Sequence, residues 1–268
     1  MGLFYLFIIA AVQGITEFLP ISSSAHLVLL PHITGQADQG LVMDVAAHVG
    51  TLFAVLVFFR RDIFNITAAM TWRYRHTNPV VKHDRRIGKM VVLATMPIII
   101  GGAILHAYLP EGIRDIRVIM VTTIVFGLLL GWADYKFTTT RDIKTMTVKG
   151  AFFIGCMQVI ALLPGTSRSG ITMTAARMLG FSRTDSARFS LLLSIPAICG
   201  AGVLATLDIV ESGRIVLGID AVIVALLSFI TAWVAITLMM RWLKTSSFTP
   251  FVIYRMILGS VLLYYIMV

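Results

Sequence analysis

The chain has 268 residues, of which 58% are hydrophobic and only 13% are charged. Soluble domains carry about 25% charged residues, so this composition excludes an ordinary soluble domain and predicts an all-α polytopic membrane protein. The net charge is +9, but the basic residues lie in short connections between apolar runs. Membrane orientation explains them better than nucleic-acid binding, so no nucleic-acid partner is expected.

The first apolar region, residues 2–33, contains two half-length apolar runs separated by polar residues between Gln13 and His26. A straight helix would place these polar groups in the hydrocarbon, and irregular backbone at that depth is tolerated only inside protein or beside a wet cavity. We therefore predict a re-entrant helical hairpin. No positively charged segment precedes it, so a cleaved signal peptide is not expected.

A bilayer core about 30 Å thick needs about 20 apolar residues in a helix. Six stretches meet this requirement and are predicted to span the membrane: Leu41 to Phe59, Met90 to Leu109, Val118 to Ala133, Ala187 to Leu207, Ala221 to Met240 and Pro250 to Val268. The two cysteines, Cys156 and Cys199, lie within apolar stretches and are interpreted as small core residues.

The connection between the first two predicted spans is strongly basic, and the positive-inside rule places it in the cytoplasm. It carries Arg60, Arg61, Arg73, Arg75, Lys82, Arg85, Arg86 and Lys89. Alternate threading then places segments 134–149, 181–188 and 241–249 on the same side. The opposite side receives segments 110–117 and 208–220, whose basic residues are Arg114, Arg117 and Arg214.

Residues 150–180 repeat the plan of an apolar run, a proline and a hydroxyl cluster, and they are predicted to form a second re-entrant hairpin. If Pro20 and Pro164 correspond, the repeat offset is 144 residues (164 minus 20). Three predicted spans separate the hairpins, so the first opens to the outside and the second to the cytoplasm. We predict one integral membrane domain, residues 1–268, with inverted repeat halves of roughly 1–133 and 134–268, a plan of many secondary transporters.

The first break places Gln13 and Glu17 four residues apart, on one face of a helix, where both side chains can act on one ion or proton. An ionisable residue inside a membrane segment is a functional candidate by default. The alternative is structural, with Glu17 capping the next helix or pairing with Arg168.

Ser22, Ser23 and Ser24 follow Pro20, and His26 lies three residues after Ser23. A hydroxyl becomes a good nucleophile when a base takes its proton, and histidine suits that task near neutral pH. The alternative is that these serines only cap a helix. His32, His48 and His106 are interpreted as mainly structural.

The second break reads Pro-Gly-Thr-Ser-Arg-Ser-Gly from Pro164 to Gly170. A turn rich in glycine and hydroxyl groups that leads into a helix presents backbone N–H groups to an anion. Arg168 can hold phosphate oxygens bidentately, and Ser167, Ser169 and Thr172 can donate further hydrogen bonds. The turn therefore predicts a phosphate site.

These residues resemble the bacterial undecaprenyl-diphosphate phosphatases of the bacitracin-resistance type. The signature Glu or Gln-x-x-x-Glu matches Gln13 to Glu17, Pro-Gly-x-Ser-Arg-Ser-x-x-Thr matches Pro164 to Thr172, and the family's histidine matches His26. Some members have glutamate where this chain has Gln13, which leaves one carboxylate fewer for a metal.

The resemblance implies hydrolysis of a C55 polyprenyl diphosphate to the monophosphate and phosphate, which recycles the cell-wall lipid carrier and confers bacitracin resistance. It also implies a divalent cation, Mg²⁺ or Ca²⁺, and a site facing the periplasm in the inner membrane, in contact with membrane lipids. The expected catalytic residues are Glu17, Ser23, His26 and Arg168. The expected phosphate-binding residues are Ser22, Ser167, Arg168, Ser169 and Thr172, and the expected metal ligands are Glu17 and Gln13.

Several alternatives stay open from the sequence. The nucleophile is Ser23, His26 or a water molecule, and a homodimer is compatible with the chain. A polyprenyl-phosphate flippase is the alternative function, since the same Glu17 and Arg168 could bind a lipid phosphate without cleaving it. A type 2 phosphatidic acid phosphatase is excluded, because that fold needs a histidine after its Ser-Arg element and this chain has none after His106.

Overall fold

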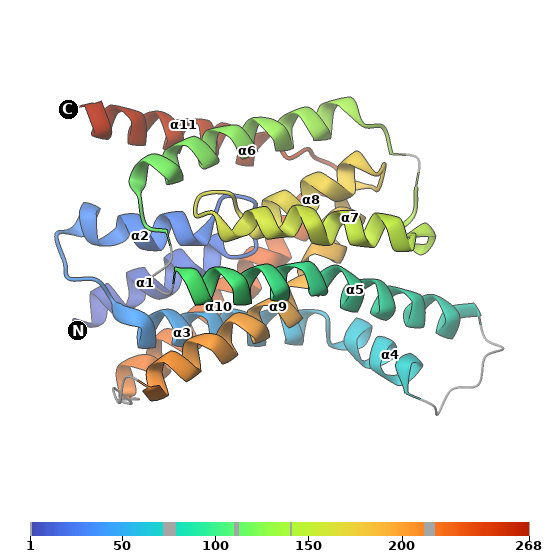
Figure 1. Cartoon of the computed structure of the whole chain (residues 1–268), viewed down its shortest axis with the longest axis horizontal. Coiled ribbons are helices and arrows are strands. Elements are labelled where there is room, and N and C mark those ends of the chain that lie inside the picture. Colours follow the sequence, from blue (N-terminus) through green and yellow to red (C-terminus); the bar gives the residue numbers. More distant parts are fainter. Residues whose placement is uncertain (1, 72–78, 110–112, 140, 212–217, 268) are drawn as a thin grey trace.

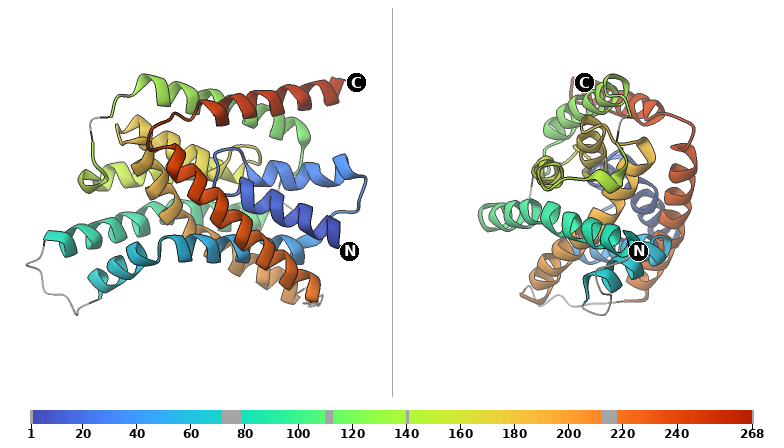
Figure 2. Two further views of the ribbon diagram at one scale, coloured as in Figure 1. Left: turned by 180° about the vertical axis from the view of Figure 1, so that it is seen from behind. Right: turned by 90° about the vertical axis from the view of Figure 1, so that its right-hand side faces the viewer.

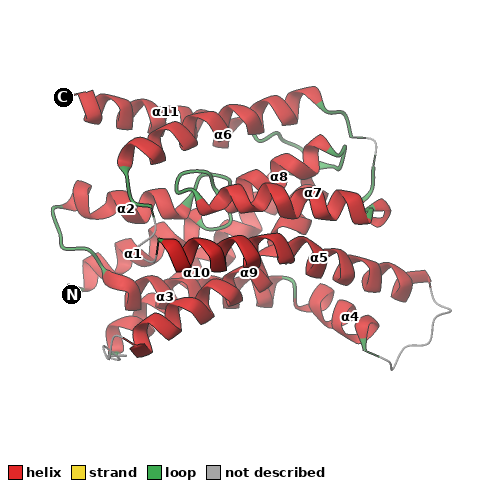
Figure 3. Ribbon diagram, viewed as in Figure 1, coloured by secondary structure: helices red, strands yellow, loops and turns green. Residues whose placement is uncertain are grey.

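The computed structural model describes residues 2–71, 79–109, 113–139, 141–211 and 218–267. Within these residues the secondary structure is helical, apart from an isolated bridge between Arg141 and Phe181 (Figure 3). Some predictions fall outside the described part of the chain. They concern the basic residues Arg73, Arg75 and Arg214 of the predicted connections and Val268, the end of the last predicted span.

Six helices of the described chain are long and apolar enough to cross a membrane. They are α3 (Gly40–Phe58), α5 (Pro79–Tyr108), α6 (Ile116–Lys136), α9 (Arg183–Glu211), α10 (Ile219–Trp242) and α11 (Thr249–Met267). Within the described residues each covers one of the predicted spans, except for the last residue of two of them, Phe59 and Leu109, and the predicted all-α class is confirmed.

Both interrupted regions fold into helix pairs. The first consists of α1 (Leu3–Thr16) and α2 (Ser23–Thr34), and the second of α7 (Val148–Val159) and α8 (Arg168–Met178), with a short 3-10 turn, η2 (Ile160–Leu162), after α7. Figure 1 shows the chain reversing direction between the helices of each pair, with the two bends facing each other near the middle of the molecule. The re-entrant placement of these hairpins in a membrane stays a prediction.

The basic connection after α3 is more ordered than the sequence indicates. It contains a further helix, α4 (Arg60–Met70), and α5 begins at Pro79, well before the predicted start at Met90. Arg85 Nε donates to the Ala69 carbonyl at 2.6 Å, and Arg188 forms an ion pair with Asp62. These basic side chains therefore tie α4, α5 and α9 together.

The hairpins pack reciprocally against the spans of the opposite half. Helix α1 lies on α10, and α7 lies on α5. Small residues permit the close approach: a Cβ atom at Gly155 of α7 would lie 2.5 Å from the Ala94 carbonyl oxygen of α5. Helices α6 and α11 lie side by side above the hairpins in Figures 1 and 2. The division into repeat halves stays an interpretation.

A buried arginine of α11 connects both bends to α6. Arg255 is 0% exposed, and its guanidinium donates to five backbone carbonyls, those of Pro20, Thr122, Thr123, Gly165 and Thr166. Buried carbonyl oxygens need donors, and one planar guanidinium with five N–H groups supplies them to three segments. Arg255 therefore fixes the position of each bend relative to the other.

Replacement of Arg255 by alanine is expected to destabilise the fold by about 3 kcal/mol, since a hydrogen bond inside a membrane protein contributes about 0.6 kcal/mol. Arg255→Lys, which keeps the charge but has fewer donors, is expected to lie between wild type and Arg255→Ala. Thermal unfolding of the detergent-solubilised protein measures the effect. Arg114→Ala, which removes an exposed ion pair with Asp38, is the control; equal melting temperatures for all four proteins would contradict the assignment.

Both cysteines differ from their predicted place. Cys156 and Cys199 are exposed, although the sequence interpretation put them in the core. The physical reason is that lipid tails are as apolar as a protein core, so a small apolar side chain is equally suited to either environment.

Candidate active site

The two bends share one backbone conformation. Ser22 precedes α2 with φ 74°, and Ser167 precedes α8 with φ 68°. Each serine hydroxyl accepts from the backbone N–H three residues later, that of Ala25 or Gly170, and also bonds the serine two residues later. The matching positions are 145 residues apart (167 minus 22), so the structural register differs by one residue from the proline alignment.

Positive φ is uncommon for residues other than glycine, and such strain persists only where the surroundings hold it. The second bend needs a true glycine at Gly165, with φ 87°, because a Cβ atom there would lie 2.6 Å from the Ile119 carbonyl oxygen. The strained turns direct the first residues of the two short helices, Ser23 and Arg168, to the meeting point of the hairpins.

Glu17 is the centre of this meeting point. Its Oε2 atom accepts from Ser23 Oγ at 2.6 Å and from Gln13 Nε2 at 3.0 Å, and its Oε1 atom accepts from Arg168 Nη2 at 2.8 Å. Glu17 as a whole is 8% exposed. Glu17 of one hairpin therefore pairs with Arg168 of the other, the contact that the structural alternative for Glu17 described.

Two polar atoms at this centre are buried without a hydrogen-bond partner among the described residues: Arg168 Nη1 and Gln13 Oε1. A buried unpaired donor or acceptor costs about 1–3 kcal/mol, so such atoms indicate a place where a ligand completes the bonding. Arg168 Nη1 is a donor that a phosphate oxygen can accept from.

His26 does not form the predicted pair with Ser23. Its Nδ1 atom lies 2.7 Å from the Ser22 carbonyl oxygen, its Nε2 atom lies 2.5 Å from Tyr254 Oη, and its ring stacks on Tyr254. A carbonyl oxygen only accepts, so Nδ1 carries a proton and, in the neutral ring, Nε2 accepts from Tyr254. The Ser23 hydroxyl donates to the Glu17 carboxylate and not to the His26 ring.

The predicted phosphate-binding hydroxyls bond to the protein itself. Ser22 caps α2, as the capping alternative proposed for the first break, and Ser167 caps α8 in the same way. Ser169 donates to the Leu19 carbonyl of the other hairpin at 2.9 Å, and Thr172 lies 2.9 Å from the Arg168 carbonyl. Each hydroxyl has a single proton to donate, and a proton used in a bond to the protein is not available to a phosphate. The role of these four residues in phosphate binding therefore stays a prediction.

Three residues near the centre were missed from the sequence. His48 of α3 places Nε2 3.7 Å from Glu17 Oε2, Tyr254 bonds His26, and Arg255 supports both bends. His48 and Arg255 carry the general signal of an ionisable group inside an apolar span. Tyr254 carries no comparable signal.

A metal ion would find few ligands here. Among the described residues, no group of three or more His, Cys, Asp or Glu side chains could hold one. The available oxygens are the unpaired Gln13 Oε1 and the Glu17 carboxylate, which already serves Arg168 and Ser23. Mg²⁺ is commonly bound by one or two protein oxygens together with substrate phosphates, and this donor set fits only that arrangement.

The arrangement combines a hydroxyl next to a carboxylate, an arginine with a free donor and the start of α8. The carboxylate can take the hydroxyl proton. The arginine and the helix N-terminus favour an anion in front of that hydroxyl. Such a centre suits attack on a phosphoryl group.

Comparison with known proteins gives a consistent result. The model of the family described as Bacitracin resistance protein BacA matches residues 6–261. The chain is 46% identical to an undecaprenyl-diphosphatase of Roseobacter denitrificans over 99% of both proteins. It is 47% identical to undecaprenyl-diphosphatases of Hahella chejuensis, over 97% of both, and Maricaulis maris, over 98% of both.

Proposed function

The chain belongs to the bacitracin resistance protein BacA family, and from that membership we propose that it hydrolyses undecaprenyl diphosphate to undecaprenyl phosphate and phosphate. The observation that carries the proposal is the contact of Glu17 with both Ser23 and Arg168 at the meeting point of the hairpins. The names of the relatives indicate the same reaction.

Ser23 is the nucleophile in this proposal. Its oxygen attacks the terminal phosphorus, its proton passes to Glu17 Oε2 at 2.6 Å, and undecaprenyl phosphate leaves as the P–O–P bond breaks. Water then cleaves the phosphoserine to release phosphate and regenerate the hydroxyl. The leaving group is a phosphate anion, which departs without a strong acid to protonate it.

Arg168 holds the terminal phosphate during this transfer. Nη2 remains on Glu17 at 2.8 Å, and the unpaired Nη1 is free to donate to a phosphoryl oxygen. Phosphoryl transfer spreads negative charge over the equatorial oxygens, so positioning and electrostatic stabilisation are the main tasks of the protein. The ion pair also orients the carboxylate toward Ser23.

A divalent cation, Mg²⁺ or Ca²⁺, would be held by Gln13 Oε1 and Glu17, and when bound it would neutralise charge on the diphosphate. Gln13→Glu adds a carboxylate at this position, so the cation concentration for half-maximal activity is expected to fall by about tenfold, since affinity follows ligand charge. Titration of metal-free protein with Mg²⁺ measures it. Gln36→Glu, at an exposed glutamine, is the control, and an unchanged titration for Gln13→Glu would place the cation elsewhere.

The proposed location is the bacterial inner membrane, with the site open to the periplasm, where carrier recycling and bacitracin resistance require it. Two observations support this: the six apolar helices and the basic residues on the opposite face of the predicted topology.

Phosphate release by the purified, detergent-solubilised chain tests the function. We expect turnover with long-chain prenyl diphosphate and loss of turnover in Glu17→Ala. A preparation that binds the lipid without releasing phosphate would contradict the proposal and leave the flippase alternative, a function that none of the relatives above bears in its name.

A further inference from the structure

Two cavities meet where α10 ends and the loop to α11 begins. The first has a volume of about 700 Å³ and is lined mostly by polar side chains, among them Arg183, Thr245, Ser246, Ser247 and Thr249. The second, of about 730 Å³, lies along α10 beside the start of α11, and its lining is mainly apolar, with Ile15, Leu19, Val234, Leu238 and Phe251. Both include Trp242 and Pro250. A polar pocket therefore continues into an apolar groove, and together they are named the α10–α11 site.

Arg183 is only partly used by the protein. Its Nε atom donates to Asp134 Oδ1 at 2.7 Å, which holds the side chain in place, and 35% of the side chain is exposed. Its terminal nitrogens have no hydrogen-bond partner among the described residues. Arg177, on the same carboxylate, donates to four further oxygen atoms of the protein. Of the two guanidinium groups, that of Arg183 is therefore the one with donors left for a ligand.

The surroundings of the polar pocket carry an excess of positive charge. The Asp134 carboxylate faces two guanidinium groups, those of Arg177 and Arg183. Arg241 lines the groove, and Lys244 is exposed in the loop. The described residues that line the two cavities include no aspartate or glutamate. The site therefore favours an anion, and guanidinium donors suit phosphate oxygens.

Trp242 marks the level of the site in the membrane. It lies where the polar pocket joins the groove, it is 45% exposed, and its Nε1 atom donates to the Ser247 carbonyl at 2.9 Å. Tryptophan is enriched at membrane interfaces, where its ring lies at the level of the lipid headgroups. The predicted topology places segments 181–188 and 241–249 on the cytoplasmic side. Figure 2 (left) shows α10 and α11 running apart from the loop that joins them, so the polar pocket lies at the inner leaflet and the groove extends into the membrane.

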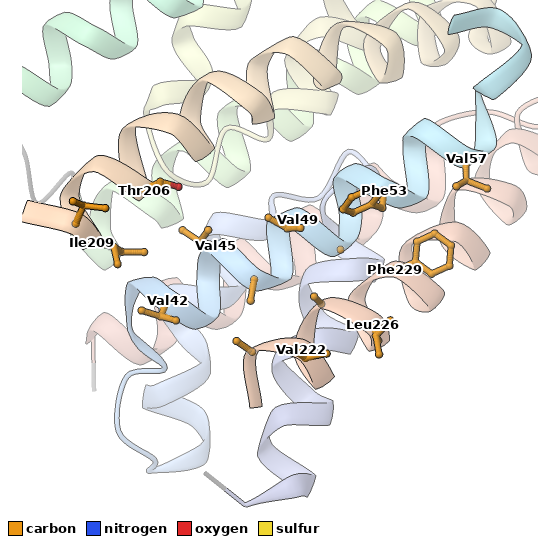
Figure 4. A pocket seen from close by; sticks show the side chains of 15 residues that line it. Val42, Val45, Val49, Phe53, Val57, Thr206, Ile209, Val222, Leu226 and Phe229 are labelled. Atoms are coloured by element: carbon orange, nitrogen blue, oxygen red, sulfur yellow. The ribbon is translucent and has the colours of Figure 1, made fainter. Parts of the chain in front are cut away.

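The cavity in Figure 4 lacks this combination. It has a volume of about 590 Å³, and valines of α3 meet Val222, Leu226 and Phe229 of α10 in it. The described residues that line it include no charged side chain. Such a lining suits any hydrocarbon chain and selects no headgroup, whereas the α10–α11 site offers a phosphate partner next to an apolar groove.

We propose that the α10–α11 site binds an anionic glycerophospholipid of the inner leaflet, with its phosphate on Arg183 and an acyl chain in the groove. Basic pockets between membrane helices on the cytoplasmic side bind anionic headgroups, and anionic phospholipids give that leaflet its negative surface. The hydroxyl groups of the loop can bond the phosphate or the glycerol of such a headgroup. The groove reaches Ile15 and Leu19 but not Glu17, so this lipid contacts the first hairpin without entering the active site. The inference does not depend on the proposed reaction.

Native mass spectrometry of the full-length, detergent-solubilised protein measures the bound lipid. Wild type is expected to bind dioleoyl phosphatidylglycerol about fivefold more tightly than dioleoyl phosphatidylcholine, and Arg183→Ala to lose this preference, the scale of one basic contact to an anionic lipid. Arg114→Ala, which removes an arginine from an exposed ion pair on the predicted outer side, is the matched control and should keep the preference. Equal affinity of wild type for the two lipids, or an unchanged preference in Arg183→Ala, overturns the proposal.

The groove provides a second test that leaves Arg183 in place. Leu238 lines the groove and Leu226 lines the cavity in Figure 4; both are on α10 and 59% exposed. Leu238→Trp fills the groove and is expected to weaken phosphatidylglycerol binding about tenfold, the effect of lost apolar pocket contacts, whereas Leu226→Trp should not. Equal weakening by both substitutions overturns the proposal.

Three further results would assign a different occupant or place and also overturn the proposal. Loss of phosphatidylglycerol binding in Arg168→Ala instead of Arg183→Ala would place the lipid in the active site. Displacement of the lipid by inorganic phosphate would make the site one for a free anion. Undecaprenyl phosphate that binds more tightly than phosphatidylglycerol, and only when Arg183 is present, would make the occupant the carrier lipid.

Discussion

Replacement of Arg168 by alanine is expected to lower kcat/KM for undecaprenyl diphosphate by about 10³-fold, the scale of losing a charge-stabilising donor from an active site. The Arg168 side chain reaches across from the second hairpin to donate to the Glu17 carboxylate of the first. Its Nη1 atom is buried without a partner in the described chain. The variant loses the phosphate donor and also leaves Glu17 without its cationic partner. Steady-state phosphate release measures the change.

Arg168→Lys separates charge from geometry. Lysine keeps a positive charge but cannot bond Glu17 and a phosphate oxygen in one plane, so its kcat/KM should lie between those of wild type and Arg168→Ala. Arg114→Ala is the control for loss of an arginine from an exposed ion pair. Turnover of Arg168→Ala within about threefold of wild type, where removal of a transition-state donor costs far more, would show that the arginine is structural.

The sequence predicted the six spans and the two breaks because membrane constraints are strong and local. A helix must be long enough to cross, and a proline beside hydroxyls and a carboxylate cannot lie in hydrocarbon. The number of residues that separates corresponding positions of the two breaks was harder to predict. Aligning Pro20 with Pro164 gives 144, whereas the shared turn at Ser22 and Ser167 gives 145, since the second turn has one more residue between its proline and its capping serine.

Burial and pairing could not be predicted in the same way. Apolar patterns do not separate a lipid-facing position from a core position, which explains the wrong interpretation of Cys156 and Cys199. The partner of Ser23 depends on how the bend before α2 turns. A spacing of three residues to His26 suggested an imidazole, but the strained turn directs the hydroxyl to Glu17 at 2.6 Å.

Replacement of Ser23 by alanine is expected to lower kcat by about 10⁴-fold or more, the range seen when a catalytic nucleophile is removed. Ser23 is the first residue of α2, and its hydroxyl donates to the Glu17 carboxylate at 2.6 Å. KM should change little, because Arg168 holds the terminal phosphate without it. Ser24→Ala, an exposed serine of the same turn, is the matched control.

The three candidate nucleophiles leave different traces in a rapid-quench experiment. Attack by Ser23 produces an acid-stable phosphoserine in the peptide that contains it, and attack by His26 produces a phosphohistidine that survives only alkaline quenching. Direct attack by water produces neither, and Ser23→Ala would then keep activity within about 10²-fold, the share of a positioned proton-transfer group. Phosphoserine formed at the rate of turnover and missing in Glu17→Gln would assign both roles, because the carboxylate that removes the proton is needed before the P–O bond to Ser23 can form.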